Sequence, residues 1–62
     1  MPEIYVHAVK GRSQEQKRAL VRDITHAVVT HFNVPIEAVM VEIVETDPAN
    51  KAKGGVFFTE RK

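Results

Sequence analysis

The hydrophobic pattern alternates over residues 3–9 with the period of a β-strand. One face of this segment carries Ile4, Val6 and Ala8, and the other carries Tyr5, His7 and Val9. Because apolar groups occur on both faces, we expect a strand that is covered on both sides. Gly11 then interrupts the pattern, since glycine adopts the positive φ angles of a tight turn without steric cost.

The pattern that follows is helical. Ser13 and Gln16 have the spacing of a capping box, and Glu15 suits the positive end of a helix dipole. An apolar stripe is formed by Leu20, Val21, Ile24, Ala27, Val28 and Phe32. The positions expected to face water are Lys17, Arg18, Arg22, Asp23, His26 and Thr30. Together they predict an amphipathic helix over residues 14–31 that packs one face on a sheet.

Pro35 ends this helix, because proline cannot continue the hydrogen-bond ladder and the residue before it avoids helical angles. One short turn over residues 35–38 leads to a second strand at residues 39–45. Its two faces carry Val39, Val41 and Ile43, and Met40, Glu42 and Val44. A strand, a helix and a strand joined by short loops predict a right-handed β-α-β unit with parallel strands, and therefore the α/β class.

The C-terminal part is polar and poor in helix formers over residues 46–53, and Gly54 and Gly55 add a flexible turn. The short apolar segment 56–59 has the composition of a strand, so we expect a short C-terminal hairpin or strand. Its two phenylalanines are expected to dock on a neighbouring subunit. The chain shows no repeat or linker, which predicts a single domain over residues 1–62.

The size of the chain indicates an oligomer. A domain of 62 residues buries only about 60% of its surface on folding, so its own core is marginal. The chain has no cysteine, which excludes disulfides and thiolate metal sites. Association with other copies is the remaining source of stability.

Charge and hydropathy exclude several partners. Nine Lys and Arg residues are interspersed with eight Asp and Glu residues, which does not suggest nucleic acid. No apolar stretch approaches the roughly 20 residues of a membrane span, and residues 1–10 lack the order of regions in a signal peptide. We expect no membrane association and a cytoplasmic location.

The candidate chemistry lies at Met1 and Pro2. Cytosolic removal of an initiator methionine before a small residue would leave Pro2 with a free secondary amine. Such an amine titrates in the α-amino range, and a partly apolar pocket disfavours its cationic form. Pro2 is therefore a candidate general base or nucleophile near neutral pH.

Several features occur in a familiar order: Met1-Pro2, a seven-residue strand, Gly11-Arg12-Ser13 leading into Glu15-Gln16-Lys17, a second strand ending in Glu45, and Gly54-Gly55. In this order the chain resembles the 4-oxalocrotonate tautomerase family over essentially its whole length. The resemblance implies a tautomerase-like β-α-β subunit that dimerises through its sheet and forms a homohexamer, a trimer of dimers, with active sites at subunit boundaries. It also implies an isomerase, of the kind used in aromatic degradation, that needs no metal or organic cofactor.

The resemblance assigns roles to individual residues. Pro2 falls on the general base, which takes a proton from the hydroxyl of a dienol and returns it to carbon. Arg12 falls on the arginine that binds the carboxylate of a small anionic 2-hydroxy or 2-oxo acid, a task that suits a planar bidentate cation. Val9 and His7 lie at matching strand positions, and backbone near Val9 is expected to orient substrate or water.

Two positions depart from the family pattern. Met40 stands where a second arginine polarises the substrate oxygen from another subunit, and Lys51 stands where an aromatic residue walls in the proline. Lys51 would supply the missing cation or lower the pKa of the nearby amine. Glu42, on the same strand face as Met40, is a second candidate for proton transfer or a partner for Arg12. These changes predict altered substrate specificity.

Two alternatives stay open. One is a hydratase, decarboxylase or dehalogenase of the same superfamily, although Lys51 and Lys53 stand where a dehalogenase would need a carboxylate. The other is a non-catalytic subunit of a hetero-oligomeric tautomerase, which Met40 and Lys51 favour. His26 and His31 are five residues apart, which does not place both on one helix face, so we expect solvent exposure and no metal site.

Overall fold

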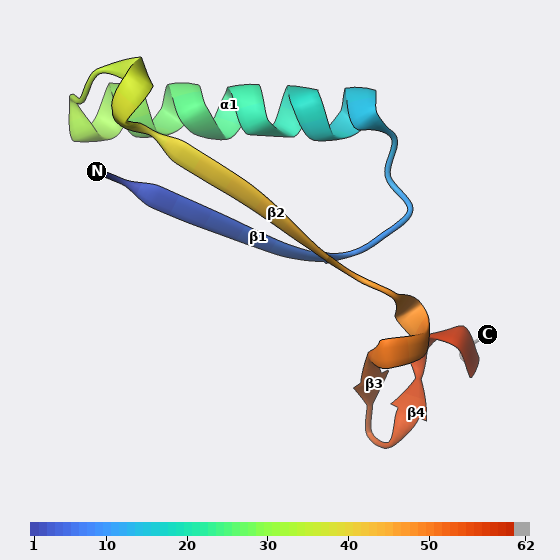
Figure 1. Ribbon diagram of the computed structural model, residues 1–62. Coiled ribbons are helices and arrows are strands. Elements are labelled where there is room, and N and C mark those ends of the chain that lie inside the picture. Colours follow the sequence, from blue (N-terminus) through green and yellow to red (C-terminus); the bar gives the residue numbers. More distant parts are fainter. Residues whose placement is uncertain (61–62) are drawn as a thin grey trace.

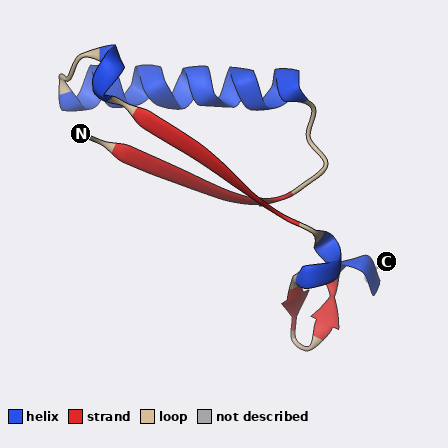
Figure 2. Ribbon diagram, in the orientation of Figure 1, coloured by secondary structure: helices blue, strands red, loops and turns tan. Residues whose placement is uncertain are grey.

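The computed structural model describes residues 1–60, and its regular elements follow the predicted order (Figure 1). The helix and strands are β1 (Glu3–Val9), α1 (Gln14–Phe32), β2 (Met40–Thr46), β3 (Ala52–Lys53) and β4 (Val56–Phe57). Single 3₁₀ turns occur at Ile36–Ala38, Pro48–Asn50 and Phe58–Glu60 (Figure 2). The prediction of a β-α-β unit with a short C-terminal hairpin is confirmed.

Strands β1 and β2 pair in parallel, with Glu3 opposite Met40 and Val9 opposite Thr46. Two backbone hydrogen bonds flank this ladder. At one end the Met40 N–H donates to the Pro2 carbonyl at 3.0 Å, and at the other the Lys10 N–H donates to the Thr46 carbonyl, also at 3.0 Å. The observed β2 is shifted by one residue from the predicted 39–45, because Val39 caps the preceding 3₁₀ turn.

Helix α1 begins at the predicted capping box. The Ser13 hydroxyl accepts from the Gln16 N–H at 3.1 Å, and the Gln16 side chain accepts from the Ser13 N–H at 2.9 Å. The helix runs one residue beyond the predicted end and is capped by Asn33, which adopts a left-handed conformation with φ of 56°. Its N–H donates to the Val29 carbonyl at 3.0 Å. Asparagine tolerates this region better than other non-glycine residues.

The helix covers one face of the two-stranded sheet. Val41, Ile43 and Glu45 of β2 line a space together with Val21 of α1, so these positions face the helix. The alternate positions, such as Tyr5 on β1 and Met40 on β2, lie on the opposite face, where both side chains are exposed. The expected cover on both sides of the strand is therefore not provided within one chain.

The C-terminal hairpin lies beyond the end of β2, apart from α1 and the main sheet (Figure 1). Residues 48–50 form a 3₁₀ turn in a stretch that was expected to be irregular, because the Asp47 side chain accepts from the Ala49 N–H at 2.9 Å. Strand β4 ends at Phe57, before the predicted 56–59 segment is complete, and the chain turns back. Val56 and Phe57 are 44% and 45% exposed, which leaves the hairpin without a core of its own.

No residue among positions 1–60 is buried. The radius of gyration is 14.9 Å, whereas a compact domain of this length has about 10.5 Å. Large apolar side chains remain exposed at several places, including Leu20 at 43%, Ile36 at 51% and Phe32 at 66%. A single copy therefore does not close a hydrophobic core, which indicates that further copies cover these side chains.

None of the helices formed by residues 1–60 combines the length and the hydropathy that a membrane span requires.

Candidate active site

Pro2 is the half-buried residue directly before β1. Its carbonyl accepts the first hydrogen bond of the sheet from the Met40 N–H, so the backbone of Pro2 is tied to the start of β2. Met1, which precedes Pro2, is 85% exposed. In the chain that begins with Met1 the Pro2 nitrogen is an amide, and loss of Met1 converts it to a secondary amine at the edge of the sheet.

Arg12 lies in the connection from β1 to α1. Gly11 has φ of 138°, which permits the chain to leave the strand, and Ser13 caps the helix. Arg12 is exposed and lines a small cavity of about 180 Å³ with Gln16, Lys17 and Leu20. It forms no ion pair with any carboxylate of residues 1–60. Its guanidinium is therefore available to an external anion.

Pro2 and Arg12 lie at opposite ends of β1 (Figure 1). The seven residues of this strand separate them by roughly 23 Å, at about 3.3 Å per residue. One copy of the chain therefore does not bring the two groups together.

The other predicted site residues divide between the same two ends. Met40 is beside Pro2, with its side chain 42% exposed on the face that α1 does not cover. Val9 is the last residue of β1 and pairs with Thr46, close to Arg12 in the chain. Lys51 follows the carboxyl end of β2, where its ammonium lies 5.8 Å from the centre of the Phe58 ring. Its carbonyl accepts from the Phe58 N–H at 2.8 Å.

A tyrosine–carboxylate pair that the sequence pattern did not single out occurs near Pro2. The Tyr5 hydroxyl donates to Glu3 Oε1 at 2.6 Å. This hydrogen bond, together with the negative charge of Glu3, raises the pKa of Tyr5. Glu42 lies opposite Tyr5 in the register and adds to the same effect. Glu3 and Tyr5 are two positions apart in β1, so their side chains lie on the same strand face. This spacing predicts their contact.

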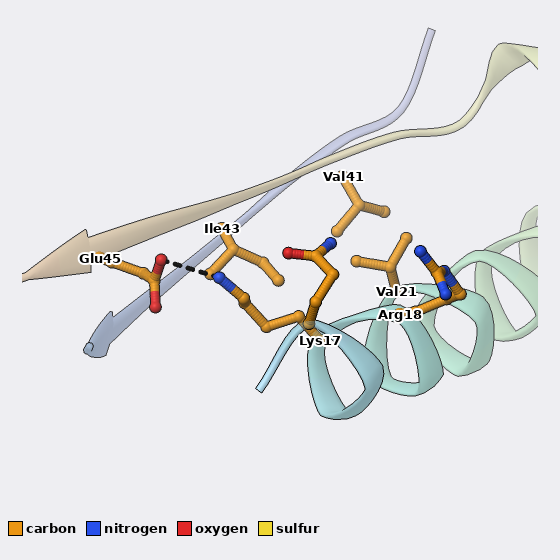
Figure 3. Close-up of a pocket in the computed structure, with 7 residues that line it drawn as sticks. Lys17, Arg18, Val21, Val41, Ile43 and Glu45 are labelled. Carbon is orange, nitrogen blue, oxygen red and sulfur yellow. Dashed lines mark hydrogen bonds and ion pairs between the residues drawn. The ribbon is translucent and has the colours of Figure 1, made fainter. Parts of the chain in front are cut away.

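An ion pair between α1 and β2 corrects two expectations. Lys17 was placed on the water-facing side of the helix, but its side chain is only 23% exposed and its Nζ lies 3.0 Å from Glu45 Oε1. Figure 3 shows the two side chains pointing toward each other across the space between helix and strand. Glu45 was expected only to end the strand. The signal was present in the spacing, because Lys17 precedes Val21 by four residues and so continues the sheet-facing stripe.

The histidines show no common site. His7 is exposed on the uncovered sheet face opposite Val44, and His26 and His31 are exposed on the helix, as expected. Residues 1–60 contain no group of three or more His, Cys, Asp or Glu side chains arranged to hold a metal ion.

Comparison with known proteins gives consistent matches. Residues 2–61 match the family described as Tautomerase enzyme. The "Probable tautomerase bsl7456" of Bradyrhizobium diazoefficiens is 46% identical over 61 residues, covering 98% of this chain and 91% of that protein. The 2-hydroxymuconate tautomerase of Stutzerimonas stutzeri is 34% identical over 55 residues, covering 89% of this chain and 87% of that protein.

The fold matches solved structures equally well. The heterohexamer 4-oxalocrotonate tautomerase from Chloroflexus aurantiacus superposes with a TM-score of 0.90 at 32% identity, with all of both chains covered. The β-α-β unit, the unpaired sheet edge and the separated candidate residues thus occur in a chain whose sequence and fold both match one family. This chain belongs to the tautomerase family of isomerases, as a relative of 4-oxalocrotonate tautomerase.

Proposed function

We propose that this protein is a cofactor-independent tautomerase of small 2-hydroxy-dienoic and 2-oxo acids, with each active site built from at least two copies of the chain. After removal of Met1, Pro2 is the general base. Arg12 of a neighbouring copy binds the substrate carboxylate. The observation that carries the proposal is the placement of these residues at opposite ends of β1, whose outer edge pairs with no other strand of residues 1–60.

The geometry of the free edge supports a two-copy site. Because Pro2 and Lys10 form the ladder bonds to β2, the even-numbered residues of β1 direct their peptide groups to β2. The odd-numbered residues direct theirs outward. A second β1, antiparallel about the midpoint Val6, would use these outward groups. Pro2 of one copy would then lie opposite Lys10 of the other, two residues from its Arg12.

The proton transfer needs only groups that the chain supplies. The Pro2 nitrogen takes the proton of the enol hydroxyl, and the oxygen electron pair forms the C=O bond. The C=C electrons shift along the diene, and the terminal carbon takes the proton back from the prolinium. The neighbouring guanidinium holds the carboxylate and, as a nearby cation, lowers the pKa of the amine toward neutrality.

Specificity is proposed to differ from that of relatives with two arginines. Met40 is the side chain nearest in the ladder to Pro2, and it offers no charge to a developing enolate oxygen. Lys51 would need to reach Pro2 of another copy. In this chain it lies over the Phe58 ring, which constrains it.

The test is to mix two inactive variants. Purified protein should ketonise phenylenolpyruvate or 2-hydroxymuconate, and intact mass should show that Met1 is absent. Pro2→Ala and Arg12→Ala should each lose activity. After co-refolding in equal amounts, sites that receive both intact residues should restore about one quarter of the wild-type rate. No recovery, with mixed oligomers shown by native mass spectrometry, would place both residues in the same copy's site or exclude one of them.

A second candidate is a partner subunit in a hetero-oligomer. Met40 and Lys51 favour it, and one structural relative is described as a heterohexamer. Light scattering of the pure chain separates the two: a hexamer with activity excludes the need for a second chain, whereas an inactive smaller species supports it.

A further inference from the structure

The Lys17–Glu45 ion pair is the most protected ion pair among residues 1–60. Its atoms are 3.0 Å apart, with the side chains 23% and 31% exposed. The Lys10–Asp47 and Arg22–Asp23 pairs are longer, at 3.9 and 3.7 Å, and all four of their side chains are about half exposed or more. Exposed pairs contribute little, whereas a short and shielded one constrains the two elements that it joins.

Lys17 also lies between two cavities. The larger one, of about 380 Å³ between α1 and β2, is lined by apolar Val21, Val41 and Ile43 and by the Lys17–Glu45 pair (Figure 3). The smaller one is the cavity that Arg12 lines, and Lys17 lines this one too. The ion pair with Glu45 directs the Lys17 ammonium toward β2. Of the two cationic residues that line the smaller cavity, Arg12 is therefore the one whose charge is available to an anion.

The backbone connects this pair to Arg12. The Lys17 N–H donates to the Ser13 carbonyl at 3.1 Å, and the capping box locks Ser13 to Gln16. On the other side of Arg12, the Lys10 N–H donates to Thr46. The loop is therefore anchored at both ends to consecutive residues of β2, Glu45 and Thr46. Gly11 between them offers little stiffness of its own, so loss of one anchor is expected to loosen the loop.

We infer that Lys17 and Glu45 are positioning residues for Arg12: their ion pair holds the start of α1 against the end of β2 and so sets where the guanidinium meets the substrate carboxylate. The inference rests on the proposed role of Arg12. Losing the pair should weaken substrate binding and leave proton transfer at Pro2 of the other copy nearly unchanged.

The test compares five variants of the full chain in its native assembly, with an anionic enol as substrate. Lys17→Met and Glu45→Gln should each raise KM about tenfold, the scale of one charge-assisted hydrogen bond, with kcat changed less than about twofold. The double variant should be no worse than either single one. The charge-swapped variant, Lys17→Glu with Glu45→Lys, should recover most of the loss. Arg22→Met removes an exposed pair on the same helix and should leave KM unchanged.

Each outcome decides the inference. Unchanged KM in Lys17→Met overturns it. So does a fall in kcat and in the mass of the assembly that the charge swap does not repair, because that pattern indicates only lost stability. Failure of the underlying proposal looks different: Arg12→Ala would then leave KM unchanged, whatever Lys17→Met does.

Discussion

The two ends of β1 differ in chemistry. Toward the amino end, Pro2 is followed by Glu3, which pairs with the apolar Met40 in the ladder and accepts a hydrogen bond from Tyr5, the residue opposite Glu42. At the carboxyl end, Lys10 forms an ion pair with Asp47, and Lys17 forms one with Glu45. Arg12, at the same end, forms no ion pair with a carboxylate of residues 1–60.

Under the proposed function, this division would let so short a chain carry a complete site. One β1 strand holds Pro2 and Arg12 apart. If the β1 strands of two copies pair antiparallel, the two-fold axis places Pro2 of one copy near Arg12 of the other. The proposed association would also cover apolar side chains that a single copy leaves exposed. Under this proposal, folding, assembly and catalysis depend on the same contacts.

Replacement of Pro2, the proposed general base, should have the largest effect on activity. Pro2→Ala is expected to lower kcat/KM for an enol substrate by about 10²–10⁴, the usual contribution of a general base. The rate of ketonisation, followed by loss of the enol absorbance, measures this. A variant that keeps the wild-type rate would show that Pro2 is only the first residue of a strand.

Replacement of Arg12, at the opposite end of β1, should have a smaller effect, and this effect should be on substrate binding. Arg12→Ala is expected to raise KM by roughly 10- to 100-fold, because it removes charge-assisted hydrogen bonds to the carboxylate. Arg12→Lys keeps the positive charge but loses the planar guanidinium. Its KM should therefore lie between that of the wild type and that of Arg12→Ala. If Arg12→Lys equals wild type, bidentate recognition is wrong.

Adding a cation at the amino end of β1 should raise activity. Met40→Arg places a donor beside Pro2 and is expected to raise kcat/KM for 2-hydroxymuconate about tenfold, a part of what such a donor supplies in a preorganised site. Met40→Leu is the control and should change little. An increase of the same size for both variants would indicate a packing effect.

The smallest effect is expected at Tyr5, the single tyrosine of the chain. Its pKa is raised chiefly by the hydrogen bond to Glu3, so Glu3→Gln should lower it, as measured by ultraviolet titration of the phenolate. Because the folded pKa is the raised one, the contact stabilises the fold below the ordinary tyrosine pKa. The contribution is lost as the pH rises through the raised value. Identical titration curves would show that the pair does not persist in solution.

Much of the fold could be read from the pattern of residues. The alternation from Glu3 to Val9, the capping box at Ser13 and the stop before Pro35 are local signals, and each produced the predicted element. The Pro48–Asn50 turn was missed, because it depends on one Asp47 side chain that accepts from the backbone two residues later. Strand β2 begins one residue later than predicted, because Val39 caps the preceding 3₁₀ turn.

The candidate site was only partly predictable. The identities of Pro2 and Arg12 followed from the order of motifs, and their roles remain proposals. The partner of Lys17 could not be found in this way, since Glu45 lies 28 residues further along the chain. Only the packing of α1 on β2 brings the two together.

Residue order decided the local elements, since strands, caps and turns depend on side chains a few positions apart. Distances between remote groups were decided by the parallel pairing of β1 and β2, which places Pro2 and Arg12 at opposite ends and Lys17 against Glu45. Strand pairing and helix packing join residues far apart in the chain, and these contacts leave no periodic signal in the order of residues.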